Sequence, residues 1–224
     1  MDAIALLKAD HKTVETLFRK FEQAGVNARK LKRKLVDQIV RELAVHAVVE
    51  EQVFYPAVRA RAEELNDDVL LALEEHHVAK WLLKELENLP PEAERFEAKV
   101  MVLIENVRTH VAQEERELFR QVRKAFTPRE LKDMAEALTL AKKAAPTRPH
   151  PRAPDTPPGN LVAGAVSAVL DMGKDAMRAA RRKAEGLSPM PATLAGKRPR
   201  KTRSTQEEER EMEQDSGAES HYLM

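Results

Sequence analysis

The pattern His-x-x-x-Glu occurs twice in this chain, at residues 46–50 and again at residues 110–114. An acidic residue followed by a histidine precedes each copy, at positions 10–11 and 75–76. The histidine of that pair lies 35 residues before the motif in the first copy and 34 residues before it in the second. This regular recurrence is expected of a duplicated helical hairpin. The repeated residues are His11, His46, Glu50, His76, His110 and Glu114.

The apolar pattern up to residue 145 is helical almost throughout and predicts an all-α fold. Short connections between four long helices predict an up-down-up-down four-helix bundle, with Pro56 bending or ending the second helix. A proline and a glutamate follow Thr127, which indicates the start of a short fifth helix. The first three expected helices cover about residues 2–25, 31–62 and 66–88. The fourth follows the third and ends at about residue 126, and the fifth covers about residues 127–144.

The spacing within each motif places histidine and glutamate side by side on a helix face, because residues i and i+4 are one turn apart. At a rise of about 1.5 Å per residue, the four histidines fall at one level of the predicted bundle. Apolar neighbours such as Val49, Val53 and Val107 indicate that these polar side chains face the core. Burying these groups without a cation would cost several kcal/mol, so we predict a dinuclear metal site.

The donor types restrict the metal. The chain has no cysteine, so a thiolate site is excluded. Imidazole and carboxylate ligands suit iron, manganese or zinc better than copper(I), and the oxygens are too few for calcium. Six protein ligands on two metals leave positions for an oxo or hydroxo bridge and for a small exogenous ligand.

Four segments, ADHKTVETLF, HAVVEEQVFYPAV, EEHHVAKWLLKEL and HVAQEERELF, resemble the hemerythrin-like HHE cation-binding family in the family's order. The resemblance covers about residues 2–125 and implies a four-helix bundle with a non-haem di-iron centre that meets O2, peroxide or nitric oxide. Manganese and zinc are less favoured than iron. The implied ligands, with Glu50 and Glu114 as bridges, are His11, His46, Glu50, His76, His110 and Glu114.

Two departures from the oxygen-carrying hemerythrins disfavour reversible O2 transport. Those proteins have a fifth histidine at the position of Lys80. They also end in His-x-x-x-x-Asp, whereas here Glu114 stands four residues after His110 and Glu115 five residues after it. We therefore expect a redox, sensing or stress-response role for a di-iron protein. The alternatives are a non-catalytic iron storage or sensing module and a structural helical interaction protein.

Four further residues lie next to the predicted ligands in the sequence. His77 follows His76, but its equivalent in the first copy is Lys12, so His76 is the preferred ligand. Glu51 and Glu115 are rotated by about 100° from the bridging glutamates and are expected to be solvated or to support the ligands. Tyr55 either donates to the site or packs in the core. The candidate supporting residues are Tyr55, His77, Glu51 and Glu115.

The composition changes near residue 145. We predict a bundle with its fifth helix over 1–145, a Pro-rich linker over 146–158 and a disordered polyampholyte tail over 187–224. For residues 159–186 the apolar stripe predicts a short amphipathic helix. It either docks on the bundle, pairs with another chain or lies on a membrane surface, or, as we favour, it is a marginal helix in a flexible tail. The basic cluster Lys197–Arg203 offers contacts to nucleic acid, but the neighbouring acidic run and the lack of aromatic residues disfavour them.

The remaining features predict a cytoplasmic protein. The formal net charge is +1, so no general attraction to nucleic acid is expected. The N-terminus lacks a basic region followed by a long apolar run, which argues against a signal peptide. No apolar stretch approaches the roughly 20 residues that span a bilayer. One chain supplies the whole ligand set, so the site does not require a dimer, and the oligomeric state stays open.

Overall fold

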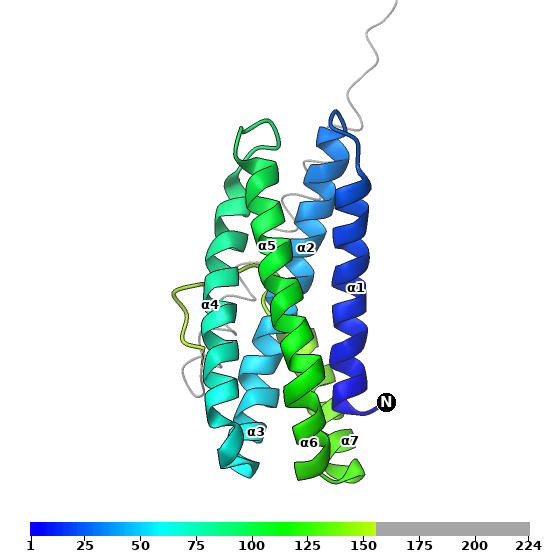
Figure 1. Cartoon of the computed structure of the whole chain (residues 1–224), viewed down its shortest axis with the longest axis vertical. Helices are drawn as coiled ribbons and strands as arrows, with labels where there is room; N and C mark the ends of the chain where they lie inside the picture. Colours follow the sequence, from blue (N-terminus) through cyan, green and yellow to red (C-terminus); the bar gives the residue numbers. More distant parts are fainter. Residues whose placement is uncertain (156–224) are drawn as a thin grey trace, which may run out of the picture. The chain divides into compact units, whose positions relative to one another are not determined.

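The computed structural model describes residues 1–155 (Figure 1). These residues contain helices and no β-strand. The helices are α1 (Ala3–Gln23), α2 (Arg29–Val49), η1 (Glu50–Phe54), α3 (Tyr55–Arg61), η2 (Glu63–Leu65), α4 (Asn66–Asn88), α5 (Phe96–Gln113), η3 (Glu114–Leu118), α6 (Phe119–Ala125) and α7 (Pro128–Ala144).

The helices form a bundle of antiparallel rods (Figure 1). The first rod is α1, the second runs through α2, η1 and α3, the third is α4, and the fourth runs through α5, η3 and α6. Successive rods run in opposite directions, which confirms the predicted up-down-up-down bundle. Helix α7 is the expected fifth helix and packs against α1, α2 and η1.

Side-chain caps define the starts of two helices, and the start at Thr127 is the one that the sequence predicts. The carboxylate of Asp2 accepts a hydrogen bond from the backbone N–H of Ala5 at 2.8 Å, at the start of α1. Thr127 and Glu130 form a reciprocal capping box at the start of α7, and Pro128 occupies the first turn. Such caps satisfy backbone N–H groups that have no partner within the helix.

The second and fourth rods are interrupted by one π-helical turn each, which the sequence analysis did not predict. The backbone N–H of Tyr55 bonds to the carbonyl of Glu50, and the N–H of Phe119 bonds to the carbonyl of Glu114. Pro56 does not end its rod, because it lies in the first turn of α3, where its missing N–H is tolerated. Both turns begin at the glutamate of the repeated motif, and the fourth rod has its turn without a proline.

The apolar core consists of two clusters separated by a polar layer. Along α1, His11 lies between Leu7 of one cluster and Val14 of the other. The same change of cluster occurs across the histidine of every rod. Because each cluster packs against all four rods, the layer between them is held at one level of the bundle. Members of the first cluster include Leu7, Phe54, Leu73, Phe119 and Leu138, and members of the second include Val14, Ile39, Leu83, Phe96 and Val107.

Residues 146–155, the beginning of the predicted Pro-rich linker, lie against the bundle. Arg148 is 6% exposed and forms an ion pair with Glu87 of α4. The guanidinium of Arg152 lies 5.9 Å from the ring centroid of Trp81. The predictions for the rest of the linker and for residues 159–186 and 187–224 lie outside the described residues. None of the helices within residues 1–155 has the length and apolar character needed to span a membrane.

Candidate metal centre

The structure brings all six residues of the repeated set into the polar layer. Every one of these side chains is buried. Glu50 and Glu114 are the first residues of the π-helical turns η1 and η3. The histidines come from four different helices, His11 from α1, His46 from α2, His76 from α4 and His110 from α5.

The histidines form two pairs through their Nε2 atoms. The Nε2 atoms of His11 and His46 are 3.1 Å apart, and those of His76 and His110 are 3.2 Å apart. Donor atoms about 3 Å apart have the separation of neighbouring ligands in a coordination shell whose bonds are about 2 Å long. Each hairpin therefore supplies one nitrogen pair suited to one cation.

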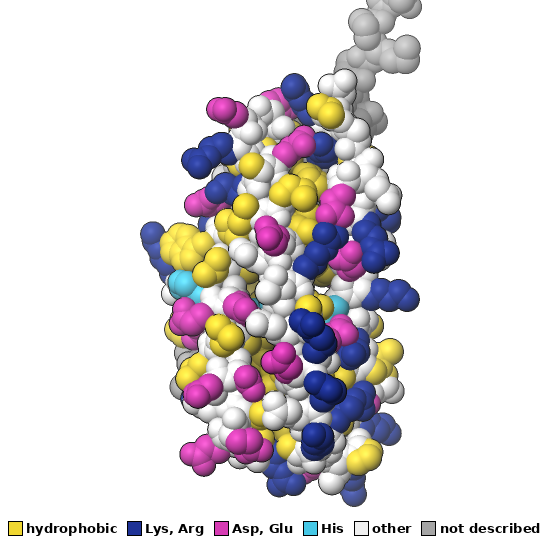
Figure 2. Space-filling view, viewed as in Figure 1, with side chains coloured by type: hydrophobic (Ala, Val, Ile, Leu, Met, Phe, Trp, Pro, Cys, Tyr) yellow, Lys and Arg dark blue, Asp and Glu magenta, His cyan; other side chains and the backbone are white. Residues whose placement is uncertain are grey.

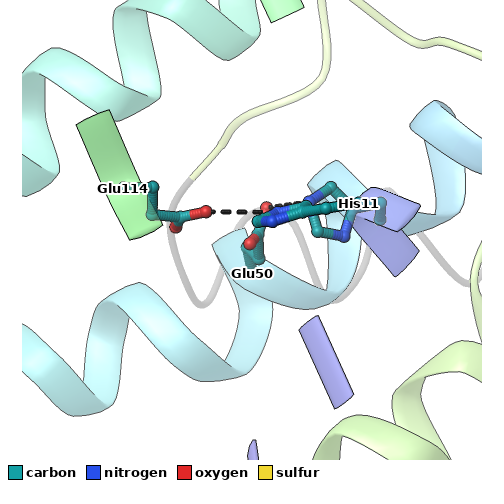
Figure 3. Close-up of side chains that lie close together, drawn as sticks. His11, Glu50 and Glu114 are labelled. Atoms are coloured by element: carbon teal, nitrogen blue, oxygen red, sulfur yellow. Dashed lines mark hydrogen bonds and ion pairs between the residues drawn. The ribbon is translucent and has the colours of Figure 1, made fainter. Parts of the chain in front are cut away.

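Glu50 lies between the two pairs. Its Oε2 atom is 3.1 Å from Nε2 of His46 and 3.5 Å from Nε2 of His76. Glu114 Oε2 is 3.4 Å from Nε2 of His11, and Figure 3 shows Glu114 pointing toward His11 with Glu50 beside them. The donors form two groups, and within each group the ligand atoms lie within 4.8 Å of one another. Glu50 belongs to both groups. They are His11, His46, Glu50 and Glu114, and Glu50, His76 and His110.

Each histidine turns its other ring nitrogen, Nδ1, toward a carboxylate on a different helix. Such contacts select the tautomer that presents Nε2 to a metal and fix the ring orientation. Glu51 and Glu115 thus lie where residues that support candidate ligands would lie, whereas the contacts of Asp10 and Glu75 were missed by the sequence analysis. The pairs are His110 with Glu75 at 2.7 Å, His11 with Glu115 at 2.9 Å, His76 with Glu51 at 3.1 Å and His46 with Asp10 at 3.5 Å.

A signal for Asp10 and Glu75 was present in the sequence. Both residues precede a histidine of the repeated set, and both occupy the same position of the duplicated hairpin. Successive helical residues point about 100° apart. One residue therefore faces the centre while its neighbour faces the adjacent helix of the same hairpin. A recurring acidic residue beside a recurring candidate ligand is therefore a signal for such a contact.

Three oxygens of the two motif glutamates have no hydrogen-bond donor among the described residues. Both oxygens of Glu50 and Oε2 of Glu114 accept no hydrogen bond from the described residues. Burial and the nearby Glu114 carboxylate raise the pKa of Glu50 well above its ordinary value. Unsatisfied buried carboxylates are costly in the absence of a cation. The donor set and its charges thus fit bound cations.

The surroundings of the histidines shift their pKa values in different directions. Burial lowers the pKa of His46, and burial together with the nearby His110 lowers that of His76 well below its ordinary value. Burial also acts to lower the pKa of His11, but its contacts with Glu114 and Glu115 reverse this effect and raise it. Neutral imidazole is the form that binds metal ions. His46 and His76 therefore hold their binding form at neutral pH.

The two halves of the layer differ in one aromatic residue. The hydroxyl of Tyr55 lies 3.3 Å from Oε1 of Glu114 and 3.3 Å from Nε2 of His76. The equivalent position in the second hairpin is Phe119, whose ring stacks on His11 with centroids 5.9 Å apart. Burial and neighbouring carboxylates raise the pKa of Tyr55 well above its ordinary value, so the hydroxyl keeps its proton. One half of the layer thus has a hydroxyl donor where the other half has a phenyl ring.

Lys80 and His77 face away from the centre of the layer. The Lys80 ammonium lies 2.7 Å from a carboxylate oxygen of Glu51, which in turn contacts His76. His77 is exposed, and its Nε2 accepts a hydrogen bond from the indole N–H of Trp81 at 3.2 Å. The structure therefore brings His76, and not His77, to the other donors.

Comparison with known proteins identifies the family. The Hemerythrin HHE cation binding domain matches residues 2–122 of this chain. The chain belongs to the hemerythrin HHE cation-binding family. This match confirms the resemblance seen in the sequence. It also agrees with the metal-binding geometry of the polar layer, since a domain of this family binds cations.

Relatives of the chain include two curated proteins and one solved structure. An uncharacterized hemerythrin-like protein of Schizosaccharomyces pombe is 29% identical over 169 residues, which are 75% of this chain and 82% of the relative. A DNA nickase of Nostoc is 31% identical over 137 residues, but these are 61% of this chain and 38% of that protein. The crystal structure of a hemerythrin HHE cation-binding domain protein from Mycobacterium kansasii has a TM-score of 0.55 and 24% identity, and the match covers 64% of this chain and 86% of that one. The structural likeness supports the fold.

Proposed function

We propose that the polar layer holds two iron ions and that the protein reacts with, or senses, O2, peroxide or nitric oxide in a redox or stress response. The observation that carries this proposal is the position of Glu50, whose carboxylate belongs to both groups of donors. A carboxylate shared by two nitrogen pairs suits a dinuclear centre. The ligands of the proposal are His11, His46, Glu50, His76, His110 and Glu114.

The donor chemistry favours iron and leaves room for a ligand. Four imidazoles and two carboxylates provide no sulfur and few oxygens, a set that suits iron, with manganese and zinc as weaker candidates. When bound, two iron ions supply redox chemistry and coordination positions that the six side chains leave free. The absence of an imidazole at Lys80 leaves one position more than a fifth histidine would.

The protein's own residues prepare the layer for this chemistry. Glu51 and Glu115 contact the Nδ1 atoms of His76 and His11, so the Nε2 atoms stay directed at the other donors and would be available to bind the metal ions. The neutral Tyr55 hydroxyl keeps a proton within 3.3 Å of Glu114. Apolar clusters flank the layer on both sides. These surroundings of low polarity strengthen the electrostatic interactions among its groups.

Metal analysis of the purified protein tests the proposal. We expect about two irons per chain, since the six side chains form two donor groups, and loss of most of this metal in the His76→Ala/His110→Ala double variant. The matched control is His77→Ala, which removes an exposed histidine next to His76 and should retain the metal. An iron-free wild-type protein after growth in iron-rich medium would contradict the dinuclear site.

Reactivity then separates the proposed role from storage. The reduced protein should change its visible absorption rapidly on mixing with hydrogen peroxide, O2 or nitric oxide. Iron that binds and leaves without such reactions would favour the storage or sensing alternative. The nickase activity of the Nostoc relative is not part of the proposal, because the match covers 38% of that protein.

A further inference from the structure

A cavity of about 400 Å³ opens between α4 and α5 and ends at the four histidines of the polar layer. Its mouth is formed by exposed residues of these two helices, Glu74 and Val78 on α4 and Glu105 and Thr109 on α5. Figure 2 shows hydrophobic and acidic side chains exposed together on the face that α4 and α5 present. The cavity therefore connects the layer with solvent at this face.

The interior walls of the cavity are apolar. They come from α1, α2, α4 and α5, so the cavity reaches across the bundle above the histidines. Most of these side chains are buried, and all except Ala47 belong to the second apolar cluster or pack against it. The walls are lined by Val14, Leu43, Ala47, Ala79, Leu83, Val107 and Val111.

The volume of the cavity exceeds what a small inorganic ligand needs. A water molecule occupies about 30 Å³ of liquid volume, and O2 and hydrogen peroxide are of similar size. Pockets of roughly 300 to 1,000 Å³ with apolar walls and few polar groups are typical of sites for organic molecules. A cavity of about 400 Å³ above the imidazoles thus has room for an organic group of several carbon atoms.

The charges around the cavity select a neutral ligand. The carboxylates of Glu74, Glu75 and Glu105 line it and repel anions. Lys80 is the lysine in the lining, and its ammonium is turned to Glu51 at 2.7 Å, which neutralises it. The long stem of Lys80 adds apolar surface to the wall. In the metal-free protein, a carboxylate or phosphate ligand would therefore gain no cation in exchange for its hydration.

We propose that this cavity binds neutral organic molecules with an aryl or branched alkyl group, placed against the histidine layer. The binding itself needs no metal, because the walls belong to the apolar core. A second step rests on the proposed function. When the layer holds iron, the molecule that reaches it through this cavity carries an apolar organic group. A diatomic ligand alone would leave most of the cavity unfilled.

Titration of the metal-free and the metal-loaded full-length protein with isopropylbenzene tests the proposal. We expect saturable binding to both forms, measured by calorimetry and by ligand-observed NMR. The charged analogue 4-isopropylbenzoate should bind the metal-free form at least about tenfold more weakly, because it brings an anion to an acidic mouth. Absence of saturable isopropylbenzene binding to both forms, or tighter binding of the benzoate to the metal-free form, would overturn the proposal.

Substitutions of residues that line the cavity test whether isopropylbenzene binds there. Ala79→Phe places a ring inside the cavity and should weaken isopropylbenzene binding by about tenfold or more. Val107→Phe fills the cavity from the opposite helix and serves if the first variant fails to fold, as judged by circular dichroism. The matched control, Ala98→Phe, adds the same ring to an exposed position of α5 and should leave binding unchanged. Equal binding to the folded filled variants and to the wild type would place the molecule elsewhere and refute the proposal.

The two proposals fail separately. A protein that contains no iron but binds isopropylbenzene in this cavity would refute the dinuclear centre and support the cavity. A protein that contains about two irons per chain but binds no isopropylbenzene would support the dinuclear centre and refute the cavity as a site for organic molecules.

Discussion

The Nδ1 atom of His110 on α5 lies 2.7 Å from a carboxylate oxygen of Glu75 on α4. Glu75 immediately precedes His76, so one helix provides both a proposed ligand and the acid that orients the next ligand. Asp10 has the equivalent position toward His46, at the longer distance of 3.5 Å. Metal affinity should therefore depend on residues that never touch the ion.

Glu75→Gln should weaken iron binding while leaving the fold intact. The amide keeps the shape of the carboxylate but removes the charge that favours Nδ1–H on His110. Loss of such a supporting group lowers metal affinity by about 10- to 100-fold. Competition with a chelator would measure the change, and Glu74→Gln, at an exposed neighbouring position, is the control. Equal affinities for the two variants would show that Glu75 does not support the site.

Tyr55→Phe should retain the wild-type metal content. The hydroxyl of Tyr55 contacts Glu114 and His76 but is not one of the six proposed ligands. Removal of its hydrogen bond should lower the stability of the metal-free protein by about 1 kcal/mol. Metal analysis and urea denaturation measure these two effects. Loss of one iron per chain in the variant would instead make Tyr55 a ligand.

Leu138→Ala should destabilise the bundle strongly. Leu138 on α7 is fully buried in the first apolar cluster, and α7 packs against the π-helical turn that begins at Glu50. A cavity at such a position costs about 2 to 5 kcal/mol. Leu140→Ala on the same helix changes an exposed side chain and should cost no more than about 0.5 kcal/mol. Similar melting temperatures for the two variants would mean that α7 adds little to the fold.

Acid should weaken the connection between α1 and α5 made by Arg108. The guanidinium of Arg108 bonds to Glu15 and Glu22, and these hydrogen bonds are the main cause of the lowered pKa of both carboxyls. A lowered carboxyl pKa stabilises the folded state above the unfolded pKa of 4.5, and this stabilisation disappears as the pH falls through the folded value. Because these groups are partly exposed, the effect should not exceed about 1 kcal/mol.

Chemical denaturation of Arg108→Met at several pH values tests this connection. The variant should be less stable than the wild type at pH 7, and the difference should shrink below pH 4.5, where the glutamates begin to be protonated in the unfolded chain. Arg19→Met, which removes a single exposed contact to Glu15, should change stability less. A stability difference that stays constant down to strongly acidic pH would contradict the role of the two carboxylates.

The sequence by itself determined the helices, their antiparallel order and the polar layer. Helical periodicity and capping are properties of one segment, so Asp2, Thr127 and the apolar stripes could be interpreted before any contact was known. The duplicated motif likewise determined which six side chains meet, because histidines at equal distances from the turns of two hairpins fall at one level. His76 could be preferred over His77 from the repeat alone.

The tertiary structure alone decided how the hairpins meet. The contacts of Glu115 with His11 and of Glu51 with His76 join different hairpins, and the rotation and axial offset of packed helices control them. The π-helical turns at Glu50 and Glu114 change that rotation by inserting part of a turn, which no single-helix pattern specifies. The cavity has the same origin, since it is the space that side chains of four different helices leave between them.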